Sequence, residues 1–164
     1  MGYHREVAED KLTEKIIGIA IDVHRSMGSD QAEQTYQEAL TYGLRKAGLE
    51  VESEKEVPVT YEGKEFGHRY VDLFVENEVV VELKVVRRAT DKHFRQLSTN
   101  VRLLEKRRGL LINFGARRVE VRRYANDHLA GAEDTDGAEG AESAEGAEGA
   151  EGAEGAEGAE GAER

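Results

Sequence analysis

Residues 70–84 read Tyr-Val-Asp-Leu-Phe-Val-Glu-Asn-Glu-Val-Val-Val-Glu-Leu-Lys, and this stretch decides the fold class. Two apolar, Val-rich runs flank a turn-like segment centred on Asn77. Runs of this kind on either side of a polar turn predict two neighbouring antiparallel strands, here 68–76 and 78–86. The sequence therefore predicts a β-hairpin in the middle of the chain.

Three polar residues interrupt the apolar runs of this hairpin: Asp72, Glu82 and Lys84. Glu82 and Lys84 are two residues apart, so their side chains point to the same face of a strand. Asp72 and Glu82 are equally far from Asn77. A hairpin centred on Asn77 therefore places the two carboxylates directly opposite each other, with Cβ atoms about 5 Å apart.

Two carboxylates in facing positions destabilise a sheet, and burial makes their repulsion worse. A divalent cation such as Mg²⁺ or Mn²⁺ relieves it, because these ions bind carboxylate oxygens while keeping several waters. Lys84 can then orient or deprotonate an attacking water, or stabilise charge on a phosphate in the transition state. The pattern favours a metal-dependent hydrolytic site, and a salt-bridged sheet surface is the alternative.

Before the hairpin, apolar residues at helical spacing predict helices over 12–27 and 31–47. Gly28 ends the first helix, and Ser29 or Asp30 is placed to cap the second. We expect these two helices to form a helical hairpin. An extended stretch follows over 51–61, and its proline, Pro58, suits an edge strand or a bulge.

After the hairpin, residues 91–106 read as a basic helix, 109–114 as a buried strand and 119–121 as a further strand. The predicted order is α-α-β-β-β-α-β-β. This order fits an α/β fold with a mixed central β-sheet flanked by helices.

The net charge of −11 hides a strong segregation of charge along the chain. Residues 131–164 carry the whole imbalance, whereas residues 84–123 contain 13 basic and 3 acidic side chains. Such a basic block suits contact with a phosphate backbone, and a solvated basic surface is the alternative. The candidate nucleic-acid-binding residues are Arg87, Arg88, Lys92, Arg95, Arg107 and Arg108.

Composition divides the chain into a folded domain over 1–128 and an acidic tail over 129–164. From Gly137 the tail repeats the triplet Gly-Ala-Glu, with Ser143 in one glycine position, and contains no proline or large apolar residue. The missing proline disfavours a collagen-like triple helix, and the composition predicts disorder. Its expected role is solubility; the alternative is that it mimics nucleic acid and screens the basic block.

The chain has no cysteine, so a bound metal must take oxygen or imidazole ligands. No apolar run approaches the roughly 20 residues that span a bilayer, and the N-terminal residues lack the apolar core of a signal peptide. The expected location is the cytoplasm.

Asp72, followed by Glu82-Leu83-Lys84 on the next strand, resembles the D…(D/E)XK signature of the PD-(D/E)XK, or restriction-endonuclease-like, nucleases. More narrowly, the chain resembles the small GxxExxY proteins of that superfamily over about residues 12–125. The stretches that carry this resemblance are 20–25, Gly28, 33–40, 81–84, 96–97 and 111–115.

The resemblance implies a restriction-endonuclease-like core preceded by the helical hairpin. It implies that Asp72 and Glu82 bind Mg²⁺ or Mn²⁺, that Lys84 is the catalytic lysine, and that Glu33 joins or supports the metal site. A helix-start glutamate favoured by the helix dipole is the alternative for Glu33.

Two weaker candidates lie on helices: His24 near the metal and Gln96 among the catalytic residues. A lone histidine on an apolar helix face is more often a satisfied core residue, and this is the alternative for His24.

The implied activity is hydrolysis of phosphodiester bonds, in DNA in preference to RNA, by a metal-activated water. A homodimer or a protein partner would then supply specificity. The alternative function is a non-catalytic module that binds nucleic acid or protein.

Two positions depart from the family pattern. Asp30 replaces the glycine that opens the GxxExxY motif, and we expect it to alter a turn and not the chemistry. Asn100 stands where a tyrosine is expected four residues after Gln96. The base-stacking or phosphate-contacting role of that tyrosine is therefore not carried over to this chain.

Overall fold

The computed structural model describes residues 3–129, and the side chains of residues 11–129. Its elements follow the predicted order. They are α1 (Tyr3–Met27), α2 (Glu33–Lys46), β1 (Val51–Tyr61), β2 (Lys64–Val75), β3 (Val79–Lys84), α3 (Asp91–Leu103), β4 (Arg108–Asn113), β5 (Glu120–Ala125) and a short 3₁₀ turn, Asp127–Leu129.

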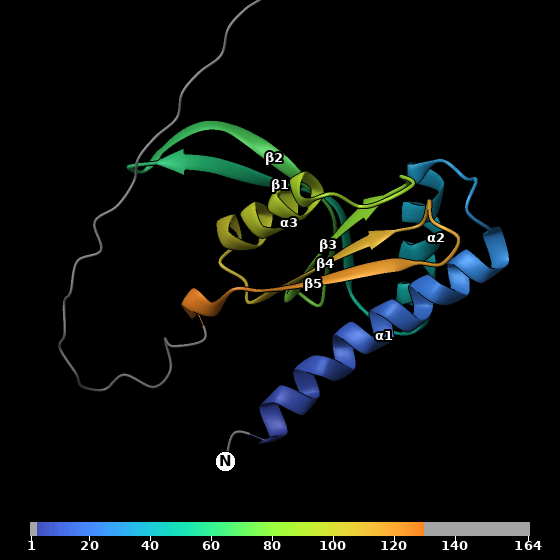
Figure 1. Ribbon diagram of the computed structural model, residues 1–164. Coiled ribbons are helices and arrows are strands. Elements are labelled where there is room, and N and C mark those ends of the chain that lie inside the picture. The colour runs from blue at the N-terminus through green and yellow to red at the C-terminus, as the bar shows by residue number, and fades with distance from the viewer. Residues whose placement is uncertain (1–2, 130–164) are drawn as a thin grey trace, which may run out of the picture. The chain divides into compact units, whose positions relative to one another are not determined.

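The five strands form one mixed sheet in the order β1-β2-β3-β4-β5. Strands β3 and β4 are parallel and are connected through α3, whereas the other neighbouring strands are antiparallel. Helices α1 and α2 pack on one face of the sheet and α3 on the other (Figure 1). The predicted α/β fold with a mixed, helix-flanked sheet is confirmed.

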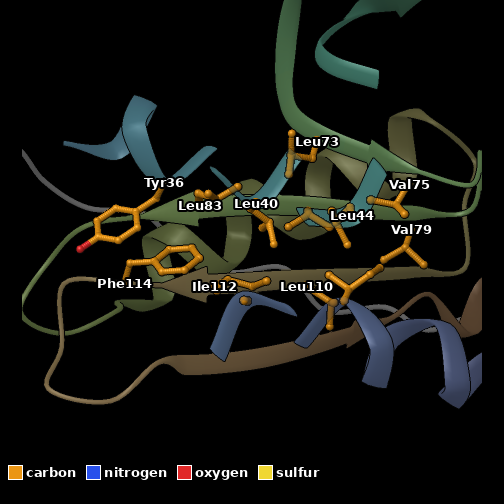
Figure 2. Close-up of a cluster of buried hydrophobic side chains, with 13 residues drawn as sticks. Tyr36, Leu40, Leu44, Leu73, Val75, Val79, Leu83, Leu110, Ile112 and Phe114 are labelled. Carbon is orange, nitrogen blue, oxygen red and sulfur yellow. The ribbon is translucent and has the colours of Figure 1, made fainter. Parts of the chain in front are cut away.

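Alternation along β3 explains the two faces. Val79, Val81 and Leu83 point into the core beneath α1 and α2, where they meet Leu40, Ile112 and their neighbours (Figure 2). Val80 points the other way and packs on Leu97 and Val101 of α3. By the same alternation Glu82 and Lys84 share the α3 face with Val80.

Two details of the helical hairpin differ from the prediction or extend it. The residue that caps α2 is Ala32, which has no side-chain hydrogen bond to the helix, so neither Ser29 nor Asp30 caps it. The apolar stripe of α2 is as predicted: Tyr36, Leu40 and Leu44 are all buried. Helix α1 begins at Tyr3, earlier than the predicted Leu12.

The turn between β2 and β3 has the predicted centre. Glu76 and Asn77 both have positive φ, 53° and 52°, and Glu78 N donates to Val75 O at 3.0 Å, as in a type I′ turn. β1 is an edge strand, and its register with β2 shifts between Pro58 and Thr60. Pro58 therefore lies on an edge strand and next to an irregularity in the pairing, both of which the sequence predicted.

β2 is paired with β3 over a short segment and with β1 over nearly its whole length. Pairing with β3 covers Leu73 to Val75, whereas β1 pairs with β2 from Val75 back to Lys64. The β1–β2 ribbon therefore extends past the point where β2 leaves β3 (Figure 1). Glu54, which would face Asp72 in this register, has φ 51° and interrupts the extended backbone there.

The chain divides into two units, Met1–Asp134 and Thr135–Arg164. From residue 130 onward the predicted acidic tail lies outside the described residues, and its disorder stays a prediction. None of the helices within residues 3–129 combines the length and the apolar character that a membrane span requires.

Candidate active site

The site begins where β2 separates from β3. Leu73 pairs with Val81, the last pair of the ladder, and Asp72 and Glu82 are the next residues along the two strands in this register. Because β2 turns away at this point, the backbone of Leu83 has no strand partner on that side. Asp72 Oδ2 accepts a hydrogen bond from Leu83 N at 2.7 Å instead. The carboxylate of Asp72 thereby holds the diverging strands together.

Glu82 is almost completely buried, with 1% of its surface exposed. Its Oε1 accepts a hydrogen bond from Asn100, whereas its Oε2 is buried and has no hydrogen-bond partner. Burial raises the pKa of Glu82 from 4.5 to about 8, and so do, to a smaller extent, the charge of Asp72 and the direct contact between the two carboxyl groups. Lys84 and Asn100 lower this pKa, but they do not offset the burial.

Glu33 lies at the start of α2, close enough to the site to sense it electrostatically. The residue is exposed, yet desolvation raises the pKa of its carboxyl group. The charge of Lys84 lowers this pKa, and that of Asp72 raises it. The carboxyl group of Glu33 is therefore within electrostatic range of Asp72 and Lys84, although the three residues come from α2, β2 and β3.

The carboxylate pair fits a hard divalent cation. Glu82 Oε2 is a buried oxygen without a partner beside a second carboxylate, and Mg²⁺ binds through one or two carboxylates while keeping waters. Among residues 11–129 no group of three or more His, Asp or Glu side chains is arranged to hold a metal. The donors present are therefore two carboxylates, and water or substrate must complete the coordination.

Asn100 is the residue at this site that the sequence analysis did not identify as functional. It is completely buried on α3, where it donates to Glu82 and accepts a hydrogen bond from Arg69 Nε at 2.8 Å. The sequence offered one sign of its importance: Asn100 stands where the family pattern has a tyrosine, four residues after Gln96. His93, on the same helix, also lies near Lys84, since burial and then the charge of Lys84 lower the pKa of this histidine.

The two weaker candidates differ in their surroundings. His24 Nε2 lies 3.0 Å from Ala116 O, a geometry in which the imidazole donates to the carbonyl, and its ring is 6.4 Å from that of Phe114. This geometry resembles a satisfied core histidine more than a metal ligand. Gln96 is half-buried one helical turn before Asn100, so the two side chains share a face of α3.

The tyrosine of the GxxExxY pattern, Tyr36, is structural. Its ring stacks on Phe114 with centroids 4.6 Å apart, and its hydroxyl donates to Gly28 O. This contact joins the start of α2 to the end of α1 and to the end of β4. Tyr36 therefore holds the helix end that carries Glu33.

The segment after Lys84 is held to the end of β4. Asn113 Oδ1 accepts from Val86 N at 3.0 Å, and Asn113 Nδ2 donates to Val86 O at 2.8 Å. Phe114 N donates to Lys84 O at 2.8 Å. A Cβ at Gly115 would lie 2.5 Å from Val86 N, so only glycine allows this close approach. The strand end that carries Lys84 is therefore fixed by its neighbour.

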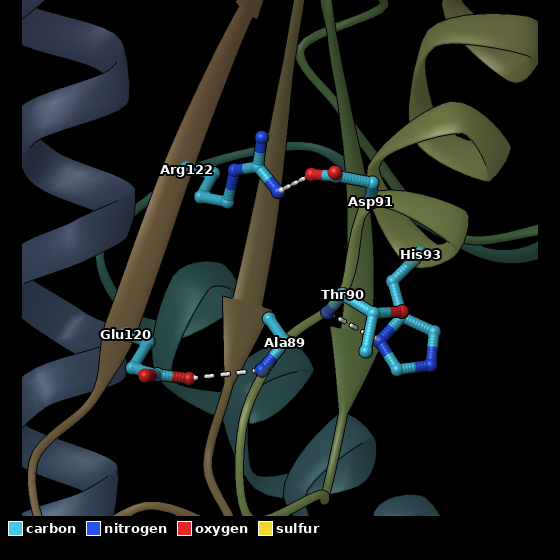
Figure 3. A network of polar contacts seen from close by, with 6 residues as sticks. All are labelled: Ala89, Thr90, Asp91, His93, Glu120 and Arg122. Atoms are coloured by element: carbon cyan, nitrogen blue, oxygen red, sulfur yellow. Dashed lines mark hydrogen bonds and ion pairs between the residues drawn. The ribbon is translucent and has the colours of Figure 1, made fainter.

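Polar contacts also fix the connection from β3 to α3 (Figure 3). Glu120 accepts from Ala89 N at 3.2 Å, and Thr90 N donates to His93 Nδ1 at 3.1 Å at the start of α3. Arg122 pairs with Asp91 at 3.2 Å. These bonds set the direction in which α3 leaves the sheet and so the position of Asn100.

The structure divides the six candidate nucleic-acid-binding residues into two groups. Arg87, Arg88, Lys92 and Arg95 are exposed and lie on the connection after Lys84 or on the first turns of α3. Arg107 and Arg108 lie at the other end of the strands, since Arg108 pairs with Val79 and Asn113 with Lys84. Arg108 and Lys84 are therefore separated along the strand direction by five residues, or about 17 Å at 3.3 Å per residue.

Both distant arginines already have partners in the fold. Arg108 pairs with Glu78 at 3.3 Å, and Arg107 donates to Leu129 O at 3.2 Å. Their position and contacts favour a structural role over contact with a substrate at Asp72 and Glu82.

Comparison with known proteins places these features in a family. The family model described as the PD-(D/E)XK nuclease superfamily matches residues 10–124, which include every element from β1 to β4 and all three acidic candidates. No curated protein and no solved structure matches the chain.

Proposed function

The chain belongs to the PD-(D/E)XK nuclease superfamily, and from this premise we propose that it is a metal-dependent nuclease that hydrolyses phosphodiester bonds in DNA. The observation that carries the proposal is the buried Glu82, whose unpartnered Oε2 lies beside the carboxylate of Asp72. A fold that needed these groups for stability alone would be better served by apolar residues, because an unpaired buried carboxylate destabilises it.

In this proposal Asp72 and Glu82 hold Mg²⁺ or Mn²⁺, and Glu33 supports the site from α2. When bound, the cation lowers the pKa of a coordinated water and neutralises charge on the phosphate. Lys84 shares the strand face of Glu82, so its ammonium can orient the attacking water or stabilise the phosphate in the transition state. Gln96, on the helix face of Asn100, would contact the water or the substrate.

The exposed Arg87, Arg88, Lys92 and Arg95 are proposed to bind the phosphate backbone next to this site. The support is their exposure and their placement directly after the strand end that carries Lys84. Phosphate contacts of this kind position a nucleic acid without reading its sequence. Specificity would then come from a homodimer or a protein partner.

Within the superfamily, we propose that the chain belongs with the GxxExxY proteins. Glu33 and Tyr36 occupy the motif positions, with Glu33 near Lys84 and Tyr36 anchoring the start of α2. Asp30, which replaces the opening glycine, lies in the exposed connection between α1 and α2.

The decisive experiment is a cleavage assay on single-stranded, double-stranded and branched DNA and RNA with Mg²⁺ or Mn²⁺. Lys84→Met should lower the cleavage rate at least 100-fold, the usual contribution of a positioned acid–base or charged group. Lys46→Met removes an exposed lysine on α2 and should leave the rate unchanged. Cleavage that is absent from every substrate, or equal in wild type and Lys84→Met, would refute the proposal.

The second candidate function is a binding module that keeps the fold without catalysis. It is favoured by the absence, among residues 11–129, of a three-ligand metal group. Calorimetric titration with Mn²⁺ separates the two functions. Binding that Asp72→Asn abolishes supports the nuclease, whereas wild-type affinity no better than millimolar supports the module.

A further inference from the structure

A chain of hydrogen bonds leads from the β1–β2 ribbon through α3 to Glu82. Arg69 of β2 donates from Nε to Asn100 Oδ1 at 2.8 Å, and Asn100 Nδ2 donates to Glu82 Oε1 at 2.5 Å. Asn100 and Glu82 are buried, with 0% and 1% of their surfaces exposed. Three separate elements therefore meet at one carboxylate.

The chemistry of the two neighbours allows the Asn100 amide only one orientation. The guanidinium of Arg69 can only donate, and Glu82 can only accept in the ionised form that binds a cation. The amide oxygen must therefore face Arg69 and the amide nitrogen Glu82. In the flipped amide, N–H groups would face each other at one end and oxygens at the other. Arg69 thus determines which group Asn100 presents to Glu82.

The two carboxyl oxygens of Glu82 differ in their hydrogen bonding. Asn100 satisfies Oε1, and Oε2 is left buried without a hydrogen-bond partner. Partners behind a ligand fix its orientation and affect metal affinity without touching the metal. Leucine at position 100 would leave Oε1 unpaired, and aspartate would add a third negative charge.

We propose that Arg69 and Asn100 are positioning residues of the metal site, which hold Glu82 by Oε1 so that Oε2 is available to a divalent cation. The inference rests on the proposed nuclease function. Neither residue touches substrate or metal. It also assigns a role to Asn100, where the family pattern leads one to expect a tyrosine, and to Arg69, which lies outside every motif.

The test is calorimetric titration of the full chain with Mn²⁺, with the heat measured for Asp72→Asn subtracted to remove binding by the acidic tail. Asn100→Leu, which keeps the branching and the number of side-chain heavy atoms, should weaken Mn²⁺ binding about tenfold or more. Arg69→Met should weaken it less, because Asn100 remains but is free to flip. The double variant should bind as weakly as Asn100→Leu and no more weakly, because both changes act through one chain of bonds.

Two control variants separate positioning from a general loss of structure. Asn126→Leu removes another buried amide. The Nδ2 of Asn126 donates to Lys106 O and makes no hydrogen bond to Glu82 or Asn100. Lys64→Met removes an exposed charge from the same strand as Arg69. Both should bind Mn²⁺ like the wild type, even though Asn126→Leu should lower the thermal midpoint.

Wild-type affinity in Asn100→Leu would overturn the inference, and so would an equal loss in Asn126→Leu. If Asn100→Leu does not fold, Arg69→Met decides alone: weakened binding supports the inference, and unchanged binding overturns it. Wild-type protein that binds no Mn²⁺ would overturn the proposed function together with the inference. Normal wild-type binding with unaffected variants would overturn the inference alone.

Discussion

Burial of Glu82 makes the stability of the metal-free protein depend on pH. Its pKa is raised from 4.5 to about 8, so between these values the folded protein holds a proton that the unfolded chain has lost. The stabilisation of the fold that comes from the protonated Glu82 is therefore fully present below about pH 4.5 and is lost as pH rises through about 8. In EDTA, the thermal midpoint should fall over this range, and Glu82→Gln should remove most of the fall.

The comparison with Glu82→Gln is needed because other groups also titrate. The pKa of His93 is lowered, which makes stability rise with pH below its ordinary value of 6.5. The pKa of Glu120 is lowered, so this residue affects the pH dependence of stability in more acidic solution. Glu14→Gln, at an exposed position of α1, should keep the wild-type profile. Identical profiles for wild type and Glu82→Gln would show that Glu82 ionises normally.

At the scale of elements, the paired ends of β3 and β4 fix the strand end that carries Lys84. A Cβ at Gly115 would lie 2.5–2.8 Å from backbone atoms of Val85 and Val86, and backbone cannot move aside as a side chain can. Gly115→Ala should therefore lower the free energy of unfolding by about 1–3 kcal/mol. It should also reduce cleavage by displacing Lys84, as measured by chemical denaturation beside the nuclease assay.

Gly18→Ala is the matched control for Gly115→Ala. Gly18 lies within α1, and a Cβ there meets nothing within 4 Å. Alanine should stabilise the helix by about 1 kcal/mol, because glycine has the lower helix propensity. If both variants changed stability in the same direction, the close approach at Gly115 would not be the cause.

The connection from β3 to α3 concentrates the exposed basic residues of the proposed DNA surface. Lys92→Ala and Arg95→Ala should each weaken DNA binding and lower the slope of log affinity against log salt by about 1 per lost phosphate contact. The measurement is fluorescence anisotropy over a range of salt concentrations, with Ca²⁺ or EDTA used to prevent cleavage. Arg102→Ala, further along the same helix, is the control.

Arg108→Ala tests the division of the basic residues into two groups. Arg108 pairs with Glu78 at the far end of β3, so its loss should lower stability and leave the salt dependence of DNA binding unchanged. A lower slope in Arg108→Ala would place the DNA at the other end of the strands. An unchanged slope in Lys92→Ala and Arg95→Ala would remove the proposed surface.

Over the whole molecule, the sequence predicted what depends on local periodicity. Alternating residues around Asn77 were enough to predict the β2–β3 register, because a one-residue slip would move every apolar side chain to the wrong face. The sequence did not predict that Asn100 meets Glu82 or that Arg69 meets Asn100. These contacts depend on how closely α3 packs and where the β1–β2 ribbon bends, which local patterns do not determine.

The basic block shows the same limit of sequence reasoning. Along the chain, Arg107 and Arg108 extend the basic helix, yet the return of the chain along α3 carries them to the opposite end of β3 from Lys84. Glu33 shows the reverse case. It is 39 or more residues from Asp72 and Lys84 in sequence, and it was linked to them by the family motif and not by periodicity.

Metal binding at Asp72 and Glu82 should stabilise the whole domain. A ligand that binds the folded state alone adds about 2.7 kcal/mol at a concentration of 100 times its Kd. For a domain of this size, that corresponds to a rise in thermal midpoint of roughly 5–15 °C. The measurement is a thermal melt in EDTA, Mg²⁺ or Mn²⁺ at pH 7.5. Because Glu82 must lose its proton to bind the cation, its raised pKa should make the rise at a fixed metal concentration smaller at lower pH.

The melt distinguishes this site from the acidic tail. The ten glutamates of residues 131–164 also attract divalent cations, but if the tail is disordered, as predicted, they do so equally before and after unfolding and cannot raise the midpoint. Asp72→Asn and Glu82→Gln should abolish the rise, whereas Lys84→Met should keep it, because in the proposed mechanism Lys84 acts on water and phosphate and does not bind the cation. A rise that survives in Asp72→Asn and Glu82→Gln would place the cation elsewhere in the fold.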